Sequence, residues 1–455
     1  MLPLTLSEVA AACGGRLEVP DHNLEVRRVC IDSRAVRPGD LFVALKGENF
    51  DGDDYAAAAL AAGATAAVVR AGTAAALPPD AARIVVEDGL RALQDLATAV
   101  RRRAGVKVVA ITGSAGKTST KDILAALLRP VARTVATAAN LNNEIGVPLT
   151  LLKIEPGTEV AVVEMAMRGA GQIRELARVA LPDVGVITNI APVHLELVGT
   201  IEDVASAKAE LIEELTDGTA VVPADEPLLG RHVRRHRGRV VTFGTEDADV
   251  HVVAEERRGE STHALLDAFG HRARLDFSFT GGHYLTDALA AVAAFVELGF
   301  RLDEAAAGAA QVAFSDLRGA LSALPGGGLL LNDAYNANPV AMKAAVDHLA
   351  AIADERPMVA VLGDMYELGA GAGSYHRAVG EHCAARGVRL VAVGDLARDY
   401  LTGAPGERWF ATVDECLAAL PDVAPAGSAV LVKASRLMRM ERVAEALAAE
   451  GAPRA

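Results

Sequence analysis

The stretch Val108-Val109-Ala110-Ile111-Thr112-Gly113-Ser114-Ala115-Gly116-Lys117-Thr118-Ser119-Thr120 decides the fold class of this chain. It begins with an apolar run typical of a buried strand, and a glycine-rich turn then leads into a predicted helix. Gly113 and Gly116 allow backbone N–H groups to surround an anion beside the helix N-terminus. Lys117 can reach terminal phosphates, and the Thr118 hydroxyl can hold Mg²⁺. The stretch therefore predicts a loop that binds a nucleoside triphosphate.

One position departs from the general pattern of such loops. A glycine is usual five residues before Gly116, and this chain has Ile111 there. An ordinary strand-to-helix turn is the alternative interpretation, but a Gly-Lys-Thr sequence directly after an apolar strand favours a phosphate-binding loop.

The rest of the chain repeats the alternation of strand and helix. Short Val/Ile/Leu runs are followed by stretches rich in Ala, Leu, Arg and Glu with helical spacing, which is typical of parallel sheets covered by helices. A length of 455 residues exceeds what one hydrophobic core usually supports. We therefore predict an α/β protein of three domains, at residues 1–88, 89–316 and 317–455.

Two changes along the sequence set these boundaries. A short strand at 83–86 and the acidic pair Glu87-Asp88 precede a connecting helix at 90–103, which would open the second domain. The third domain would begin after Phe314-Ser315-Asp316, because Gly326-Gly327-Gly328 then forms a turn before another apolar strand.

Composition excludes several classes of protein. The formal net charge of −14 argues against a surface that coats nucleic acid, although a local basic pocket can still bind phosphate. The four cysteines lack the spacing of a zinc site or a disulfide framework: Cys13, Cys30, Cys383 and Cys416. There is no basic leader and no apolar stretch long enough to span a bilayer. We expect a soluble, cytoplasmic protein with no nucleic-acid or membrane partner.

Three further residues are candidates for chemistry, each with an ordinary alternative. The apolar run 160–163 ends in Glu164, which is a candidate Mg²⁺ ligand or, equally, a solvated acid at a strand end. His194 follows another apolar run, where a lone histidine is more often structural. Lys208 lies on a predicted helix at 201–215, where a solvated surface lysine is the default interpretation.

A polar loop at 137–148 contains asparagines that could hydrogen-bond a sugar or a peptide, namely Asn140, Asn142 and Asn143. Asparagine-rich turns are also common without any function. None of these segments decides the function alone, so their combination and order carry the interpretation.

Taken in order, these segments resemble the Mur ligase family, which forms amide bonds with ATP during peptidoglycan synthesis. The resemblance covers nearly the whole chain, and the family's own phosphate loop is shorter, which accommodates Ile111. It rests on Asp32-Ser33-Arg34, Pro38-Gly39-Asp40-Leu41-Phe42-Val43-Ala44-Leu45-Lys46-Gly47, Thr112-Gly113-Ser114-Ala115-Gly116-Lys117-Thr118, Asn140-Leu141-Asn142-Asn143-Glu144-Ile145-Gly146-Val147-Pro148, Glu164-Met165, His194-Leu195-Glu196, Lys208, Asp333-Ala334-Tyr335-Asn336-Ala337-Asn338-Pro339 and Leu362-Gly363-Asp364-Met365-Tyr366-Glu367-Leu368-Gly369.

Within the family, the last two segments resemble the branch that adds D-alanyl-D-alanine to UDP-MurNAc-tripeptide. The sibling that adds the third amino acid carries an Asp-Asn-Pro-Arg motif, which is absent here. The resemblance implies that ATP phosphorylates the terminal carboxylate of the tripeptide and that the dipeptide amine attacks the acyl phosphate. The alternatives are that sibling ligase, a folylpolyglutamate synthetase and a nucleotide-binding regulator that hydrolyses nothing. Whether the third residue of the tripeptide is diaminopimelate or lysine is left open.

The resemblance also implies the architecture and the cofactors. An N-terminal domain would bind the UDP end of the substrate, a central domain with a parallel sheet would bind ATP and Mg²⁺, and a C-terminal Rossmann-like domain would close over the nucleotide. We expect a monomer.

The resemblance further assigns roles to individual residues. Lys117, His194 and Lys208 would be catalytic, Lys208 as a carbamate formed with carbon dioxide. The implied metal ligands are Thr118, Glu164 and His194. The implied ATP contacts are Gly113, Ser114, Ala115, Gly116, Lys117, Thr118, Ser119, Arg318, Asp333 and Asn336, and the implied substrate contacts are Ser33, Arg34, Asn140, Asn142 and Asn143.

Three segments depart from the family pattern, at four positions in all. A His-Asn-x-x-Asn segment reads His283-Tyr284-Leu285-Thr286-Asp287 here, so the adenine contacts are left open. Asp53 replaces the histidine of an Asp-Gly-His segment. Ala434 replaces the glycine of a Lys-Gly-Ser-Arg segment, and we expect that loop to survive unless the position needs a positive φ.

Overall fold

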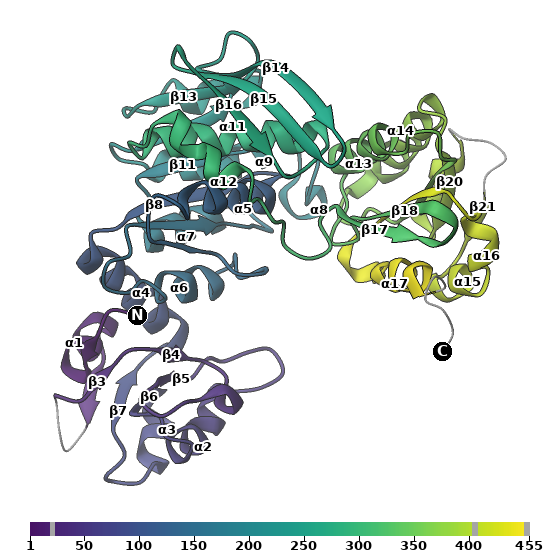
Figure 1. The fold of residues 1–455 in the computed structure, drawn as a ribbon. Helices are drawn as coiled ribbons and strands as arrows, with labels where there is room; N and C mark the ends of the chain where they lie inside the picture. The colour runs from purple at the N-terminus through teal and green to yellow at the C-terminus, as the bar shows by residue number, and fades with distance from the viewer. Residues whose placement is uncertain (19–22, 403–407, 450–455) are drawn as a thin grey trace.

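A computed structural model describes residues 1–18, 23–402 and 408–449 of the chain. Figure 1 shows three lobes, with the N-terminal lobe and the C-terminal lobe attached to different sides of the central one. In the part of the chain that is described, no helix is long and apolar enough to cross a membrane.

The N-terminal lobe contains a small sheet in the order β2-β7-β6-β5-β4 and a separate pair, β1-β3. Strands β4 to β7 are parallel, and β2 pairs antiparallel with β7. The elements are β1 (Leu4–Thr5), α1 (Leu6–Cys13), β2 (Arg16–Glu18), β3 (Glu25–Val26), β4 (Val29–Cys30), η1 (Ser33–Ala35), β5 (Leu41–Val43), η2 (Gly52–Tyr55), α2 (Ala56–Ala61), β6 (Ala66–Arg70), α3 (Ala71–Ala76) and β7 (Arg83–Val86).

The central lobe is built on a sheet in the order β16-β15-β14-β13-β12-β11-β8-β10-β9. Its elements are α4 (Gly89–Ala104), β8 (Lys107–Thr112), α5 (Lys117–Leu128), β9 (Thr134–Ala136), α6 (Gly146–Leu151), β10 (Val160–Glu164), α7 (Gln172–Ala180), β11 (Val184–Ile187), α8 (Leu195–Val198), α9 (Ile201–Glu214), β12 (Thr219–Pro223), η3 (Pro227–Leu229), α10 (Gly230–Val233), β13 (Val240–Gly244), β14 (Val250–Arg258), β15 (Ser261–Ala268), β16 (His271–Phe277), α11 (Gly282–Glu297), η4 (Leu302–Ala305) and α12 (Ala306–Ala309).

Strand β8 is apolar almost throughout because helices cover both faces of the sheet around it. Val108 and Ala110 belong to the core shared with α4, α6, α7 and α9, and Val109 and Ile111 belong to the core shared with α5 and α11. A parallel strand buried on both faces needs such a continuous apolar run. The predicted strand, turn and helix at 108–120 are thus confirmed as β8 and α5.

The predicted parallel sheet is confirmed from β9 to β14, and the structure adds an antiparallel extension. Strand β15 pairs antiparallel with β14, and β16 pairs antiparallel with β15. Many side chains of β14 and β16 are exposed, so these strands lack the continuous apolar run of a doubly covered strand. Figure 1 shows them at the far end of the lobe from the N-terminal domain.

The C-terminal lobe has a sheet in the order β17-β18-β22-β19-β20-β21, parallel except for β17. One core joins it to α13 and α14, and another joins it to α15 and α17. The elements are β17 (Ala320–Leu324), η5 (Pro325–Gly327), β18 (Gly328–Asn332), α13 (Pro339–Ile352), β19 (Met358–Gly363), η6 (Gly369–Gly371), α14 (Ala372–Ala385), β20 (Arg389–Val393), η7 (Leu396–Thr402), β21 (Arg408–Phe410), α15 (Val413–Ala418), α16 (Leu420–Val423), β22 (Ala429–Lys433), η8 (Arg436–Met438) and α17 (Glu441–Ala449).

Each sheet of the described residues lies within one of the three predicted domains, but the proposed boundaries are not sharp in the packing. Leu93 and Leu96 of α4 belong to one continuous core with Leu6 of the N-terminal lobe and Val108 of β8. The linking helix therefore joins the first two domains through apolar contacts. Boundaries at 88/89 and 316/317 remain our proposal, and residues 403–407 and 450–455 of the third domain lie outside the described residues.

Candidate active site

A cavity of about 830 Å³ lies where the central and C-terminal lobes meet. Strands β8, β10 and β11 are neighbours in the central sheet, and the residues at or just after their carboxyl ends line this cavity. Parallel sheets commonly bind ligands at this edge. From the C-terminal lobe, the segment after β18 and the start of α13 complete the lining.

The turn between β8 and α5 has the backbone of a phosphate cradle. Gly113 and Gly116 have φ values of 152° and 77°, a region that glycine adopts readily. A Cβ atom at Gly116 would lie 2.2 Å from an Asp287 carboxyl oxygen, so a side chain at this position would require Asp287 or the loop to move. Lys117 Nζ donates to the Gly113 carbonyl at 2.8 Å. Burial lowers the pKa of Lys117, and the nearby Glu164 carboxylate opposes that shift.

Asn189, directly after β11, holds the phosphate loop in shape. Its Oδ1 accepts from the Ala115 amide at 2.9 Å, and its Nδ2 donates to the Ala115 carbonyl at 3.2 Å. The Thr188 hydroxyl also donates to that carbonyl, at 2.5 Å. Neither residue was predicted as part of the site, although their place just after a strand that neighbours β8 was a usable signal.

Thr118 and Glu164 meet at the base of the cavity. The buried Thr118 hydroxyl donates to Glu164 Oε2 at 2.9 Å, and Asn142 Nδ2 donates to Glu164 Oε1 at 2.7 Å. The hydroxyl and carboxylate are hard oxygen donors of the kind Mg²⁺ prefers, and this cation usually takes few protein ligands beside substrate phosphates. In residues 1–18, 23–402 and 408–449, no group of three or more His, Cys, Asp or Glu side chains could hold a metal ion. The pair therefore fits a cation completed by phosphate.

His194 lines the same cavity and contacts the C-terminal lobe. Its Nδ1 atom makes a short contact with Glu367 Oε2, and its backbone is left-handed at φ 55°. Burial lowers the pKa of His194, and the Glu367 carboxylate acts in the opposite direction. Glu367 belongs to the motif at 362–369, but no role was predicted for it. Its contact with His194 joins residues that are 173 positions apart in the sequence.

Lys208 is a buried residue of α9 rather than a surface lysine, with a residue exposure of 2%. Burial and the positive charge of Lys117 lower its pKa well below the ordinary value. A buried amine of this kind favours its neutral form, which is the nucleophilic form.

The C-terminal lobe contributes Arg318, Asp333 and Asn336 to the cavity lining. The Arg318 guanidinium lies 4.1 Å from the centre of the Tyr335 ring. Lys433 Nζ contacts the Asp333 carboxylate and donates to the Asn336 carbonyl at 2.9 Å. These contacts hold the segment after β18 against the end of β22.

Both departures in the segment at 283–287 lie at the cavity. Tyr284 stacks on Phe314 with ring centres 4.3 Å apart, and Asp287 is buried beneath Gly116. Burial raises the pKa of Asp287 well above its ordinary value, while Arg318 and a hydrogen bond with Ser119 act in the opposite direction.

The other two departures are structural. Asp53 forms an ion pair with Arg70 inside the N-terminal lobe. Ala434 is not among the described non-glycine residues with positive φ, so its methyl group introduces no backbone strain. The expectation that the loop at 433–436 survives is confirmed by the well-formed end of β22 and the hydrogen bond from the Tyr366 amide to Ser435 Oγ at 2.9 Å.

The predicted substrate residues divide into two groups. Asn140, Asn142 and Asn143 line the cavity, but Asn142 already holds Glu164 and Asn143 Oδ1 accepts from the Gly146 amide at 2.9 Å. Ser33 and Arg34 lie in the N-terminal lobe, outside the cavity lining, where Arg34 pairs with Asp32 at 2.8 Å.

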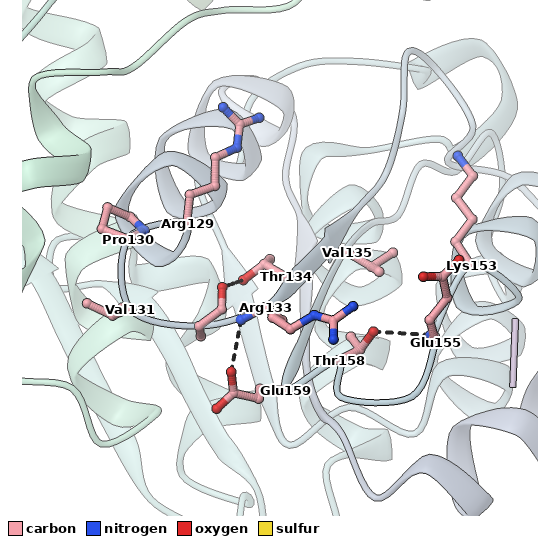
Figure 2. Close-up of a pocket in the computed structure, with 11 residues that line it drawn as sticks. Arg129, Pro130, Val131, Arg133, Thr134, Val135, Lys153, Glu155, Thr158 and Glu159 are labelled. Atoms are coloured by element: carbon pink, nitrogen blue, oxygen red, sulfur yellow. Dashed lines mark hydrogen bonds between the residues drawn. The ribbon is translucent and has the colours of Figure 1, made fainter.

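A second cavity, of about 540 Å³, lies at strand β9 and contains none of the predicted site residues. Figure 2 shows that the side chains of Arg129, Arg133 and Lys153 extend in different directions and do not converge on one point. Arg133 is held through its backbone amide, which donates to Glu159 at 2.9 Å.

Comparison with known proteins gives consistent matches along the chain. Residues 25–101 match the model of the Mur ligase family, catalytic domain, residues 111–295 match the Mur ligase middle domain, and residues 321–436 match the Mur ligase, glutamate ligase domain. The chain is 34% identical to the UDP-N-acetylmuramoyl-tripeptide–D-alanyl-D-alanine ligase of Bacillus subtilis, over 98% of this chain and 99% of that protein.

Two solved structures are similar over nearly their whole length. MurF from Acinetobacter baumannii superposes with a TM-score of 0.90 at 31% identity, covering 98% of this chain and 99% of that one. MurF ligase from Thermotoga maritima in complex with ADP gives a TM-score of 0.82 at 31% identity, covering 93% and 98%. The phosphate loop and the residues of the C-terminal lobe thus lie in a fold that binds ADP in a relative.

Proposed function

The chain belongs to the Mur ligase family, and we infer that it is the ATP-dependent ligase that joins D-alanyl-D-alanine to UDP-MurNAc-tripeptide. The product, UDP-MurNAc-pentapeptide, is a peptidoglycan precursor. The observation that carries the site assignment is one cavity lined by Lys117, Thr118 and Glu164 from one lobe and by Arg318 and Asp333 from the other.

The first half of the reaction brings two anions together. The terminal carboxylate of the tripeptide attacks the γ-phosphate of ATP, ADP leaves, and an acyl phosphate forms. Lys117 offsets negative charge on the transferred phosphoryl group, because a fixed cation stabilises charge strongly in a site that excludes water. The Gly113–Gly116 turn supplies backbone amides for the phosphates. The amine of D-alanyl-D-alanine then attacks the acyl carbon and releases phosphate.

Thr118, Glu164 and His194 are the residues that would hold Mg²⁺. The cation supplies charge neutralisation between phosphate and carboxylate when bound. Thr118 and Glu164 lie within hydrogen-bond distance of each other, and Asn142 fixes the second carboxylate oxygen of Glu164. Asn142 would thereby orient Glu164 rather than contact substrate.

Lys208 would act as a carbamate. Its buried, neutral amine attacks carbon dioxide at the carbon atom and loses a proton, which converts a nitrogen base into an anionic oxygen donor. The lowered pKa supports this step because only the neutral amine reacts. The anion formed would also offset the charge of Lys117 nearby.

Ser33 and Arg34 would bind the UDP end of the substrate, and Asn140 and Asn143 would lie along the path from there to the phosphate loop. Arg318, Asp333 and Asn336 would contact ATP from the C-terminal lobe. We propose that the enzyme acts in the cytoplasm, where its nucleotide substrates are, and as a monomer, because one chain supplies the cavity lining from both lobes.

The experiment that tests this function compares two substrate pairs with purified protein and ATP. UDP-MurNAc-tripeptide with D-alanyl-D-alanine should yield pentapeptide, ADP and phosphate, measured by mass spectrometry and phosphate release. UDP-MurNAc-dipeptide with diaminopimelate or lysine should yield nothing. Product from the second pair alone would assign the chain to the sibling ligase, and no product from either would refute the ligase function.

A further inference from the structure

The contact between His194 and Glu367 joins the two lobes at the edge of the active-site cavity. His194 precedes α8 of the central lobe, and Glu367 precedes η6 of the C-terminal lobe; Figure 1 shows α8 where these lobes meet. The Nδ1 atom of His194 faces Glu367 Oε2 at hydrogen-bonding distance. His194 lines the cavity, whereas Glu367 is not one of its lining residues. The carboxylate therefore lies behind the imidazole ring.

Backbone contacts fix this pair beyond the side-chain contact. The Glu196 amide donates to the Glu367 carbonyl at 3.5 Å, and the Gly369 amide donates to Glu196 Oε1 at 3.3 Å. His194 and Glu367 both have left-handed backbones, at φ 55° and φ 63°. Residues other than glycine rarely adopt this conformation, and it persists only where surrounding contacts determine it, often at functional sites.

The chemistry of the two groups determines which imidazole nitrogen carries the proton. A carboxylate can only accept a hydrogen bond, so Nδ1 must be the protonated nitrogen of a neutral ring. Nε2 then retains its lone pair and can bind a cation. Carboxylates commonly orient metal-binding histidines in this way, and the contact fixes both tautomer and ring direction.

We propose that Glu367 is a positioning residue that makes His194 competent as a ligand only when the C-terminal lobe docks on the central lobe. Docking brings the carboxylate to Nδ1, and the lone pair of Nε2 then faces the cavity. Closure of the lobes and preparation of His194 as a cation ligand are thus one event. This proposal rests on the proposed function, because it takes His194 to be a ligand in the ligase reaction.

The ordinary alternative is an interdomain contact that holds the lobes together without any effect on the tautomer of His194. Glu196 offers a matched control, because its carboxylate accepts from the Gly369 amide in the same docking contact, whereas the hydrogen-bond partner of His194 Nδ1 is Glu367. A docking role predicts similar losses from Glu196→Ala and Glu367→Ala. A positioning role predicts a larger loss of activity from Glu367→Ala than from Glu196→Ala.

The test uses the full chain with ¹⁵N-labelled histidine at pH 8, with the His194 signals assigned by comparison with His194→Gln. In the wild type, His194 should carry its proton on Nδ1, and in Glu367→Ala it should change to a tautomer mixture or to Nε2–H. This measurement of the tautomer needs neither ATP nor Mg²⁺. Glu367→Gln should retain much of the Nδ1–H form, because an amide oxygen can still accept.

Steady-state rates complete the test. Glu367→Ala should lower kcat about 10- to 100-fold, the range typical of losing a residue that orients a metal ligand, with KM for UDP-MurNAc-tripeptide nearly unchanged. Glu367→Gln should recover part of the loss, and Glu196→Ala should lose less than about 3-fold.

An unchanged His194 tautomer in Glu367→Ala, or an equal loss of kcat in Glu196→Ala, would overturn the proposal. If the alanine variant does not fold, Glu367→Leu, which fills a similar volume but cannot accept a hydrogen bond, takes its place in both measurements, with the same outcome overturning the proposal. An inactive wild type would refute the proposed function instead, and the tautomer would still be measurable.

Discussion

Lys117 is the residue on which the phosphate-loop assignment depends most. Its ammonium group folds back onto the Gly113 carbonyl, 2.8 Å away, and lies at the wall of the cavity rather than in a surface ion pair. A bound triphosphate would offer the same ammonium group a stronger partner than a neutral carbonyl.

Lys117→Ala should therefore remove most of the activity while the fold survives. Loss of a direct contact to the transferred phosphoryl group should lower kcat about 100- to 1,000-fold, or about 3–4 kcal/mol of barrier. Steady-state phosphate release measures the rate, and circular dichroism checks the fold. Lys107→Ala, at the exposed start of the same strand, should keep its activity because it loses only a surface ion pair with Asp183. A folded Lys117→Ala variant with near-normal turnover would refute the assignment.

Lys208→Ala should be almost inactive, and short carboxylic acids such as acetate should restore part of the activity. The added carboxylate would occupy the space left by the side chain and would replace the carboxylate-like end of the carbamate. Lys208→Met, which keeps most of the side-chain length but cannot form a carbamate, should be equally inactive, and it should unfold at a higher temperature than Lys208→Ala because it fills the buried space that alanine leaves empty. Full activity in either variant, measured by phosphate release, would return Lys208 to a structural role.

At the scale of elements, the turn from β8 to α5 combines two constraints on Gly116. Its φ of 77° disfavours any side chain, and the Asp287 carboxyl leaves no room for one. Gly105, at the end of α4, has a similar φ of 65° but open space around it. Alanine substitutions at the two glycines therefore distinguish the cost of a left-handed backbone, which both positions share, from the cost of a steric clash, which only Gly116 has.

Gly105→Ala should lower the free energy of unfolding by about 1–2 kcal/mol, the usual cost of a left-handed conformation for alanine, and leave ATP binding unchanged. Gly116→Ala should lower the free energy of unfolding by more than Gly105→Ala does. It should also abolish ATP binding, because the loop must move away from Asp287. Urea unfolding and nucleotide titration by calorimetry measure the two effects. Equal stability losses in both variants, with ATP still bound, would show that Asp287 yields easily.

Local pattern was sufficient for the elements that carry the phosphate loop. Strand β8, helix α4 and the strand ending at Glu164 follow from apolar runs, glycine-rich turns and helical spacing, which depend on neighbours in sequence. The antiparallel pairing of β15 and β16 was not predicted, because pairing depends on partners that a local pattern does not name.

The same limit applies to the site. The family resemblance implied that Lys117, Glu164 and His194 serve one site, and all three line the cavity. The hydrogen bonds of Asn189 to Ala115 and the contact of Glu367 with His194 join distant segments, so only the folded chain reveals them. The assigned roles of these residues remain predictions.

At the scale of the whole molecule, the C-terminal lobe completes a cavity whose other walls belong to the central lobe. Asn338 Nδ2 reaches the Ser114 carbonyl at 3.5 Å, and Thr280 Oγ1 lies 3.1 Å from His348 Nε2 across the same junction. These contacts are sparse, so relative motion of the lobes is the expected behaviour of the free enzyme.

ATP analogue and UDP-MurNAc-tripeptide together should lower the radius of gyration of the wild type in solution scattering, because bound nucleotide adds contacts from both lobes. Asp333→Ala should show a smaller change, since it removes a group of the C-terminal lobe that lines the cavity. An unchanged radius at saturation with both ligands would show that the lobes do not move, and the gating role of closure would be abandoned.

The central claim, that ATP activates the tripeptide carboxylate before the amide forms, is tested most directly by oxygen transfer. UDP-MurNAc-tripeptide labelled with ¹⁸O in its terminal carboxylate is incubated with the enzyme, ATP and D-alanyl-D-alanine, and the released phosphate is analysed by mass spectrometry. An acyl phosphate requires that one labelled oxygen leaves with the phosphate and the other remains in the new amide carbonyl. Phosphate without label, alongside normal pentapeptide formation, would contradict this account.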